Sequence, residues 1–114
     1  MKKINIIKEN EEYSRIINKV KPFKYKEYLI FLEKKQNLPY QFGFSISKHL
    51  CKAVVRNRIK RQLKDIIDEN NYKNSFKCII MVNRNILSKS YDEMKKDLND
   101  CFKKLNIIGG SNEK

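Results

Sequence analysis

The chain has 114 residues, and its 26 lysines and arginines outnumber its 13 aspartates and glutamates, which gives a formal net charge of +13. This length suits one compact domain, which we place at residues 1–108, with residues 109–114 as a disordered tail. So strong a positive charge favours a polyanionic partner. No apolar run approaches the roughly 20 residues of a membrane-spanning helix, and the start lacks the apolar segment of a signal peptide, so we expect a cytoplasmic protein without membrane contact.

Hydrophobic periodicity divides the chain into three helices and three or four strands. The helices show apolar residues three and four apart, and Ser90 with Glu93 forms a capping box before the last one. In chain order we expect a helix at 10–20 capped by Asn10, a strand at 23–33 that is either continuous or broken near Lys26 and Glu27, a turn at 36–39, a strand at 40–47, a helix at 53–68, a polar loop at 70–75, a strand at 77–82 and a helix at 91–105. One sheet with helices packed against it follows, which is an α+β two-layer sandwich. Within the strand at 40–47, Gly43 indicates a close approach by another part of the chain.

The cysteines and the single histidine argue against two kinds of site. Cys51, Cys78 and Cys101 are far apart in the sequence, and no Cys-x-x-Cys pair occurs. With only His49 to join them, they predict neither a disulfide framework nor a zinc site. We interpret them as small buried apolar residues in a reducing compartment, and we expect no metal site in the protein.

Arginine is concentrated in one short segment. Arg56, Arg58 and Arg61 lie within six residues, although lysine outnumbers arginine 21 to 5 in the whole chain. Lysine supplies a hydrated point charge, whereas the planar guanidinium of arginine binds phosphate through two parallel hydrogen bonds and stacks on bases. The cluster therefore indicates a surface that recognises phosphate.

Residues 44–49 and 52–64 carry the most specific pattern in the chain. The first segment reads Phe-Ser-Ile-Ser-Lys-His, and the second reads Lys-Ala-Val-Val-Arg-Asn-Arg-Ile-Lys-Arg-Gln-Leu-Lys. Together they resemble the signature of the protein subunit of bacterial ribonuclease P, and the length, the basic charge and the order of elements agree. The sequence departs from the family pattern at Cys51, where glycine is usual, and at Lys64, which is often arginine.

The resemblance implies both a fold and a function. The fold is a four-stranded sheet flanked by helices, with an unusual left-handed βαβ crossover through the arginine-rich helix. The function is to bind the catalytic RNA of ribonuclease P and the 5′ leader of precursor tRNA, while the RNA, with Mg²⁺, performs the endonucleolytic cleavage. The protein would then be an enzyme subunit with no catalytic residue of its own and no obligate protein partner. The residues expected to bind RNA are Lys48, Lys52, Arg56, Asn57, Arg58, Lys60, Arg61 and Lys64.

The family also has a leader-binding cleft between the first helix and the sheet. Tyr13, Ile17 and Phe31 align with the positions that line it, and Ile17 stands where the family usually has an aromatic residue. From their spacing alone we expect such residues to lie in the core, because apolar side chains at helical or strand spacing are most often buried. Both interpretations remain open at the level of sequence.

Three other functions fit parts of the sequence. A ribosomal or ribosome-assembly protein that binds rRNA is the strongest alternative, because it would share the expected fold and the net charge. A helix-turn-helix DNA binder is disfavoured, because a strand and not a short helix precedes the arginine-rich helix. A self-sufficient nuclease is disfavoured, because no acidic residue lies between Phe42 and Lys64 to assist His49. General rRNA binders have no reason to share the contiguous signature.

Overall fold

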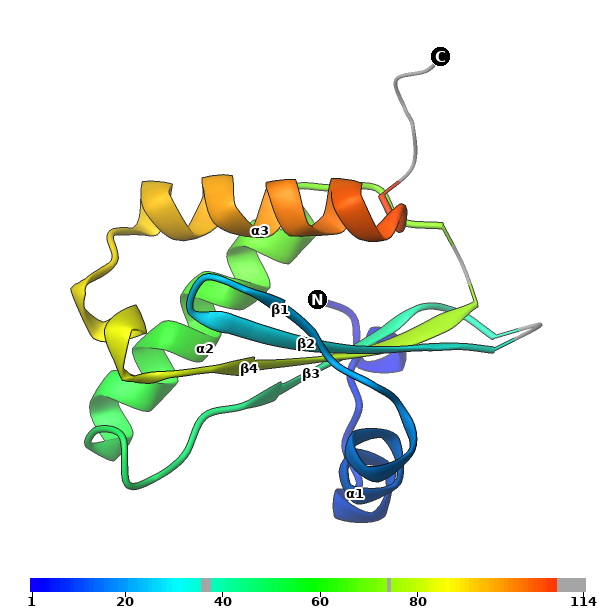
Figure 1. Ribbon diagram of the computed structural model, residues 1–114, viewed down its shortest axis with the longest axis horizontal. Helices are drawn as coiled ribbons and strands as arrows, with labels where there is room; N and C mark the ends of the chain where they lie inside the picture. The colour runs from blue at the N-terminus through cyan, green and yellow to red at the C-terminus, as the bar shows by residue number, and fades with distance from the viewer. Residues whose placement is uncertain (36–37, 74, 109–114) are drawn as a thin grey trace.

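The computed structural model describes residues 1–35, 38–73 and 75–108 (Figure 1). It contains three helices and one four-stranded sheet, which confirms the α+β class. The elements, in chain order, are the 3₁₀ helix η1 (Lys3–Asn5), α1 (Asn10–Lys19), β1 (Phe23–Tyr25), β2 (Tyr28–Lys34), β3 (Gln41–Ser45), α2 (Ala53–Asp68), β4 (Phe76–Val82), the 3₁₀ helix η2 (Arg84–Ser88) and α3 (Tyr91–Leu105). Among the described residues, none of the helices combines the length and the hydropathy of a membrane span.

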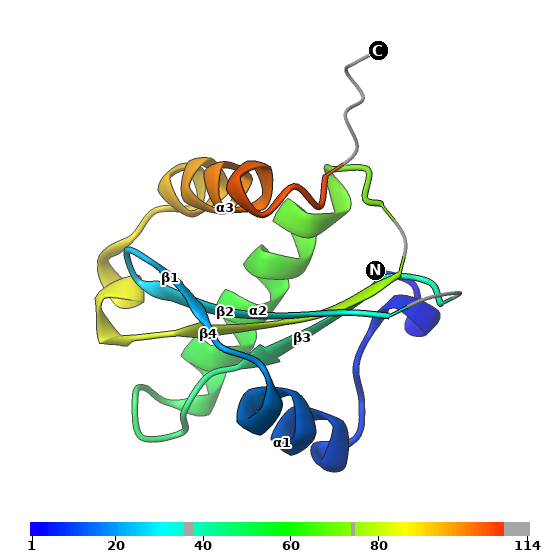
Figure 2. The ribbon, with the colours of Figure 1, turned by 45° about the vertical axis from the view of Figure 1, so that its right-hand side comes forward.

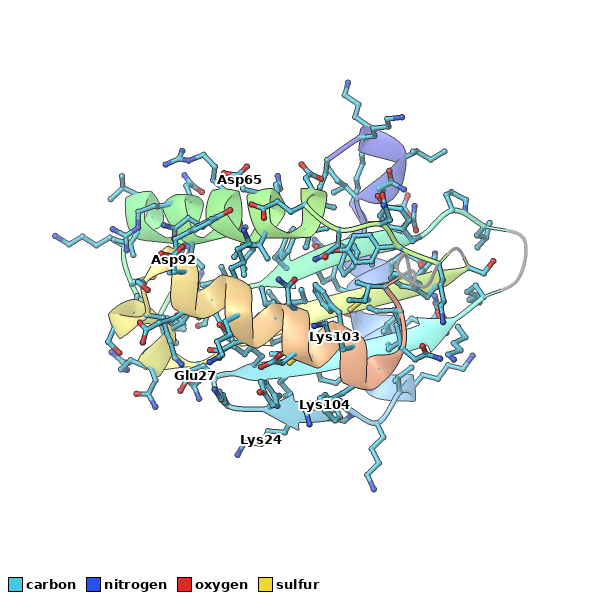
Figure 3. The ribbon with its side chains drawn as sticks, turned by 90° about the horizontal axis from the view of Figure 1, so that it is seen from above. Lys24, Glu27, Asp65, Asp92, Lys103 and Lys104 are labelled. Carbon is cyan, nitrogen blue, oxygen red and sulfur yellow. The ribbon has the colours of Figure 1, made fainter. Side chains whose placement is uncertain are left out.

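The sheet is mixed, with strand order β1-β2-β4-β3. β2 pairs antiparallel with β1 and β4, whereas β3 pairs parallel with β4. The central position of β4 explains its apolar run, since both of its faces are covered in the middle of the strand, at Cys78, Ile79 and Ile80. The parallel pair needs a crossover, and α2 provides it. In the view from the helix side (Figure 3), β4 lies to the left of β3 when the strands point upward. The crossover is therefore left-handed, whereas about 98% of such connections are right-handed.

Two cores lie on opposite faces of the sheet. α2 and α3 cover one face, and α1 lies beneath part of the other (Figures 1 and 2). The larger core includes an aromatic cluster of Phe42, Tyr72, Phe76 and Phe102, whose ring centroids lie 5.0 to 6.3 Å apart. The smaller core, under α1, has four buried residues, Ile7, Ile16, Phe31 and Ile79, with partly buried apolar side chains packed around them. α1 is therefore held by a smaller apolar core than α2 and α3.

Most of the helix and strand ends lie where the sequence predicts them. The capping box of α3 is confirmed, because Glu93 N–H donates to Ser90 Oγ at 3.1 Å and Ser90 N–H donates to Glu93 Oε1 at 2.8 Å. Of the two alternatives for residues 23–33, the structure shows the broken strand, with Lys26 between β1 and β2 in the left-handed region at φ +50°. The capping role of Asn10 is wrong. Glu9 is the N-cap, because its carbonyl already accepts the first helical hydrogen bonds from Glu12 and Tyr13.

Two expectations concern residues outside the described part of the chain. The turn at residues 36–39 includes 36 and 37, and the tail at 109–114 falls there entirely.

A buried carboxylate fixes the β1–β2 turn against α3. Asp97 lies 3.0 Å from Lys26 Nζ and 2.9 Å from Lys89 Nζ, and Tyr28 donates to it at 3.5 Å. Burial alone would raise the pKa of Asp97, but the hydrogen bonds from Lys89 and Lys26 outweigh it, and the pKa is lowered. Two lysines are thus used to hold the structure together.

Candidate nucleic-acid interface

The connector between β3 and α2 presents cations at the start of the helix. Lys48, His49 and Lys52 are exposed, and Lys52 is the N-cap residue of α2. Arg56 ties the helix to this connector, because its Nη1 donates to the carbonyl of Cys51 at 2.9 Å and to that of Lys48 at 3.4 Å. Cys51 does not have a positive φ. The family's glycine is therefore not needed here for backbone conformation.

α2 has one buried face and one basic face, as its periodicity predicts. Ile59, Leu63, Ile66 and Ile67 are buried against the sheet and α3. On the opposite side, Asn57, Arg58 and Arg61 are exposed, and neither arginine forms an ion pair with any described residue. Lys60 and Lys64 are partly buried at the margins of this face. The two guanidinium groups are thus available to an outside anion.

Sequence analysis did not single out Val54, which is 73% exposed on the first turn of α2. Val54 lies one turn before Arg58 and two turns before Arg61, so the three share a stripe on the helix. An apolar residue outside the apolar face is the sequence signal that could have identified it.

The charges along α2 run opposite to those that would stabilise a helix. Its first turn has no acidic residue and its last turn has no basic one, whereas Asp65 and Asp68 lie exposed near its C-terminal end. The helix dipole makes anions favourable at the N-terminus and cations favourable at the C-terminus, each worth about 0.3–1 kcal/mol. This arrangement costs stability, and it concentrates positive potential at the N-terminal half of α2.

A groove of about 490 Å³ lies between α1, β3 and α2. Tyr13 and Ile17 line it from α1, and Lys60 lines it from α2. The groove therefore adjoins the basic face of α2. The lining residues are Lys8, Asn10, Tyr13, Ser14, Ile17, Phe44, Ser45, Ile46 and Lys60.

The structure does not place Phe31 in this groove. Phe31 is only 4% exposed and packs with Ile16 and Ile79 in the small core. Its side chain points towards α1, and α1 covers it completely enough to prevent contact with a base. Of the two interpretations that the sequence leaves open for Phe31, the structure therefore favours packing in the core.

Tyr13 is held by specific contacts at the hydroxyl end of its ring. Its hydroxyl accepts a hydrogen bond from Phe44 N–H at 3.1 Å and donates to the carbonyl of Ile7 at 3.3 Å. Its edge lies against Gly43, where a Cβ atom would come within 2.6 Å of the hydroxyl oxygen. The close approach expected at Gly43 is thus confirmed. Burial raises the pKa of Tyr13, so the hydroxyl remains a neutral donor.

An ion-pair cluster, which sequence analysis did not identify, fixes α1 on the sheet. Arg15 donates to both carboxylate oxygens of Glu33, at 2.6 and 2.8 Å, and to Glu12 at 3.1 Å. Lys77 of β4 also pairs with Glu12. Hydrogen bonds from Lys77 and Arg15 lower the pKa of Glu12 to about 2, and the hydrogen bonds from Arg15 lower that of Glu33. We call these four residues the α1 clamp.

Comparison with known proteins points to the same family as the sequence motif and the geometry of the site. A family model described as Ribonuclease P matches residues 1–106. The chain belongs to the ribonuclease P protein family. It is 32% identical over 107 residues to the ribonuclease P protein component of Bacillus cereus (strain AH187), covering 91% of this chain and 93% of that one. It is equally similar to the component of Bacillus anthracis (strain A0248), covering 91% of this chain and 90% of that one.

Solved structures of ribonuclease P proteins share the fold. The RNase P protein of Staphylococcus aureus superimposes with a TM-score of 0.82 at 20% identity, covering 94% of this chain and all of that one. The RNase P protein of Thermotoga maritima gives 0.76 at 15% identity, covering 86% and 94%. The three-helix, four-stranded arrangement is therefore that of this family.

Proposed function

We propose that this ribonuclease P protein binds the catalytic RNA through α2 and its preceding connector, and binds the 5′ leader of precursor tRNA in the groove beside α1. The RNA performs the endonucleolytic cleavage, and the protein contributes no catalytic group. The residues proposed to bind the catalytic RNA are Lys48, Lys52, Arg56, Asn57, Arg58, Lys60, Arg61 and Lys64.

The observation that carries the proposal is the pair of exposed guanidinium groups on α2. Arg58 and Arg61 lie one turn apart, neither forms an ion pair with a described carboxylate although Asp65 follows on the same stripe, and the charge order of their helix opposes its dipole. Stability does not explain such an arrangement, whereas recognition of phosphate does. A planar fork can grip a phosphate through two parallel hydrogen bonds.

The groove beside α1 suits a single strand better than a duplex. Its walls combine an aromatic residue, Tyr13, with an aliphatic one, Ile17, and Lys8 and Lys60 stand at its rim. Unpaired nucleotides bind such surfaces by placing bases against side chains while the backbone follows positive charge. Because Ile17 offers no ring for stacking, Ile17→Phe should tighten leader binding, by up to about 1–3 kcal/mol per stacked base.

Mg²⁺ belongs with the RNA in this proposal. Among the residues that the structure describes, no group of three or more histidine, cysteine or carboxylate side chains is placed to hold a metal ion. The surface around α2 is cationic and does not fit a divalent cation. Its cations would instead neutralise RNA phosphates that Mg²⁺ would otherwise have to screen.

The test is cleavage of precursor tRNA by the cognate catalytic RNA, with and without the protein, across a range of Mg²⁺ concentrations. We expect the protein alone to cleave nothing and to lower the Mg²⁺ concentration that the RNA requires. Cleavage by RNA-free protein, or an unchanged Mg²⁺ requirement, would refute the proposal. Mature tRNA serves as the leaderless control for affinity.

A further inference from the structure

Val54 is the most exposed large apolar side chain among the residues that the structure describes. It is 73% exposed, and the next, Ile4, is 59% exposed. Its neighbour Val55 packs against the larger core, whereas Val54 belongs to neither core. Val54 therefore adds little to the packing of α2, and its two methyl groups face solvent on the basic side of the helix.

Helix stability does not explain a valine at this position. Val54 lies in the first turn of α2, where the helix dipole favours an acidic side chain. A valine has no charge to interact with that dipole, and an exposed valine leaves most of its apolar surface in water. The choice of residue resembles the charge order of α2, because both are unfavourable for the free helix. Contact with a partner explains both.

Polar groups that recognise nucleotides border the side chain of Val54. Asn57 and Arg58 follow it by three and four residues on the same side of the helix, and both are exposed. Helical side chains lean towards the N-terminus, so those of Asn57 and Arg58 cover the turn that carries Val54. No acidic residue occurs from Lys48 to Lys64. The result is an apolar surface bordered by an amide and a guanidinium group, and we call these three residues the Val54 spot.

The Val54 spot does not suit duplex RNA. An A-form helix stacks its bases, and its accessible surfaces carry phosphates, 2′-hydroxyl groups and base edges. An unpaired nucleotide in a loop or bulge also exposes the face of its base, against which a side chain can pack. Val54 offers methyl groups for that face, and Asn57 offers an amide for the hydrogen-bonding edge. Arg58 offers a guanidinium group for the phosphate.

We propose that the Val54 spot binds an unpaired nucleotide of the catalytic RNA, with its base against Val54, its edge at Asn57 and its phosphate at Arg58. This proposal rests on the proposed function, because it takes the catalytic RNA as the partner of α2. It adds that the start of α2 recognises a loop or a bulge, whereas the arginines alone would bind any row of phosphates. Positive charge attracts the RNA, and Val54 determines which part of the RNA binds at the start of α2.

The experiment measures the affinity of wild type and Val54→Ala for two labelled RNAs, the cognate catalytic RNA and a fully paired duplex. We expect Val54→Ala to bind the catalytic RNA about five-fold more weakly, because two methyl groups lose their contact with the base. It should bind the duplex as wild type does. The slope of log affinity against log salt should not change, since valine releases no counterions. Val54→Thr should also weaken binding to the catalytic RNA, because it keeps the size of the side chain but places a hydroxyl group against the base.

Two further variants serve as controls. Ile4→Ala removes apolar surface from an exposed side chain outside α2 and should leave both affinities unchanged. Arg61→Gln should weaken binding to both RNAs, because a phosphate contact does not depend on an unpaired base. Thermal unfolding should show no loss of stability in Val54→Ala, since the side chain is exposed and alanine is the better helix former.

Three results would overturn the proposal. Val54→Ala or Val54→Thr could bind the catalytic RNA as tightly as wild type, Val54→Ala could lose as much affinity for the duplex, or its loss could be no greater than that of Ile4→Ala. If Arg61→Gln also bound the catalytic RNA as wild type does, the proposed function would fail. Weaker binding by Arg61→Gln with no change in Val54→Ala would refute only the Val54 spot.

Discussion

Arginine has two different uses in this molecule, on α1 and on α2. Arg15 of α1 is bound by Glu33 and Glu12, with both of its terminal nitrogens engaged. Arg58 and Arg61 of α2 are exposed and pair with no carboxylate in the described part of the chain. The side chain is the same, but one guanidinium holds the fold together and the other two face solvent.

The difference teaches that net charge alone does not locate a binding surface. Lys26, Lys77 and Lys89 are also engaged by carboxylates, so part of the charge of +13 serves packing. The cations available to a polyanion are those without an acidic partner, and α2 with its connector carries a run of them from Lys48 to Lys64 that no carboxylate interrupts. On α2 the charged side chains oppose the helix dipole. α1 is only ten residues long, and because short helices are marginal in isolation, it depends on the α1 clamp for stability.

The largest expected effect is the loss of stability in acid. The carboxylates of the α1 clamp and Asp97 all have lowered pKa values, with that of Glu12 at about 2. The unfolded chain takes up protons at their ordinary values of 3.8 to 4.5, before the folded protein does. Their contribution is therefore present above about pH 4.5 and lost as the pH falls towards 2. The midpoint of thermal unfolding should fall steeply across this window. A midpoint that stays flat would show that the ion pairs do not stabilise the fold.

Arg15→Ala should lower the free energy of unfolding by about 2 kcal/mol. This estimate lies between the ~0.2–1 kcal/mol of exposed pairs and the ~3–5 kcal/mol of broken buried pairs, because the Glu33 side chain is 6% exposed but that of Arg15 is 35% exposed. Urea unfolding measures the change. Lys19→Ala, which removes an exposed ammonium 3.5 Å from Glu33, is the control and should cost less than about 0.5 kcal/mol. Equal losses of unfolding free energy in both variants would show that Arg15 has no special role.

Gly43→Ala should lower the free energy of unfolding by about 1–2 kcal/mol, because the new methyl group displaces the Tyr13 ring from its hydrogen bonds. The loss should shrink when Tyr13 is also replaced by alanine, since the clash is then absent. Urea unfolding of the two single variants and the double variant gives the coupling. Additive losses would mean that Gly43 is needed for another reason.

Arg58→Lys and Arg61→Lys should leave stability within about 0.5 kcal/mol of wild type, because neither side chain has a partner among the described residues. Affinity for the catalytic RNA should nevertheless fall by about 1 kcal/mol, roughly five-fold, because the charge remains but the fork is lost. Lys2→Arg is the control and should be silent in a titration against labelled RNA. Unchanged affinity in both arginine variants would mean that α2 contributes only bulk charge.

The sequence predicts what depends on local pattern. The amphipathic face of α2 and the capping box at Ser90 are each encoded within a few residues, and the structure confirms both. The exposed position of Arg58 and Arg61 follows from the same periodicity.

Features that depend on distant contacts could not be predicted in this way. Arg15 and Glu33 are 18 residues apart in the sequence, and nothing local indicates their pairing. The burial of Phe31 depends on which row of the sheet α1 covers, and strand alternation fixes only the face. The left-handed crossover came from the family resemblance, because general rules favour the opposite hand.

The most direct test of the division between engaged and available cations is the salt dependence of binding to the catalytic RNA. Arg61→Gln and Arg15→Gln each remove one positive charge, and both should be measured well below their unfolding midpoints. We predict that Arg61→Gln lowers the slope of log affinity against log salt by about 0.7 to 0.9, the value for one phosphate contact, while Arg15→Gln leaves the slope unchanged. Equal reductions in both variants would contradict the division and would show that the RNA senses only the total charge of the protein.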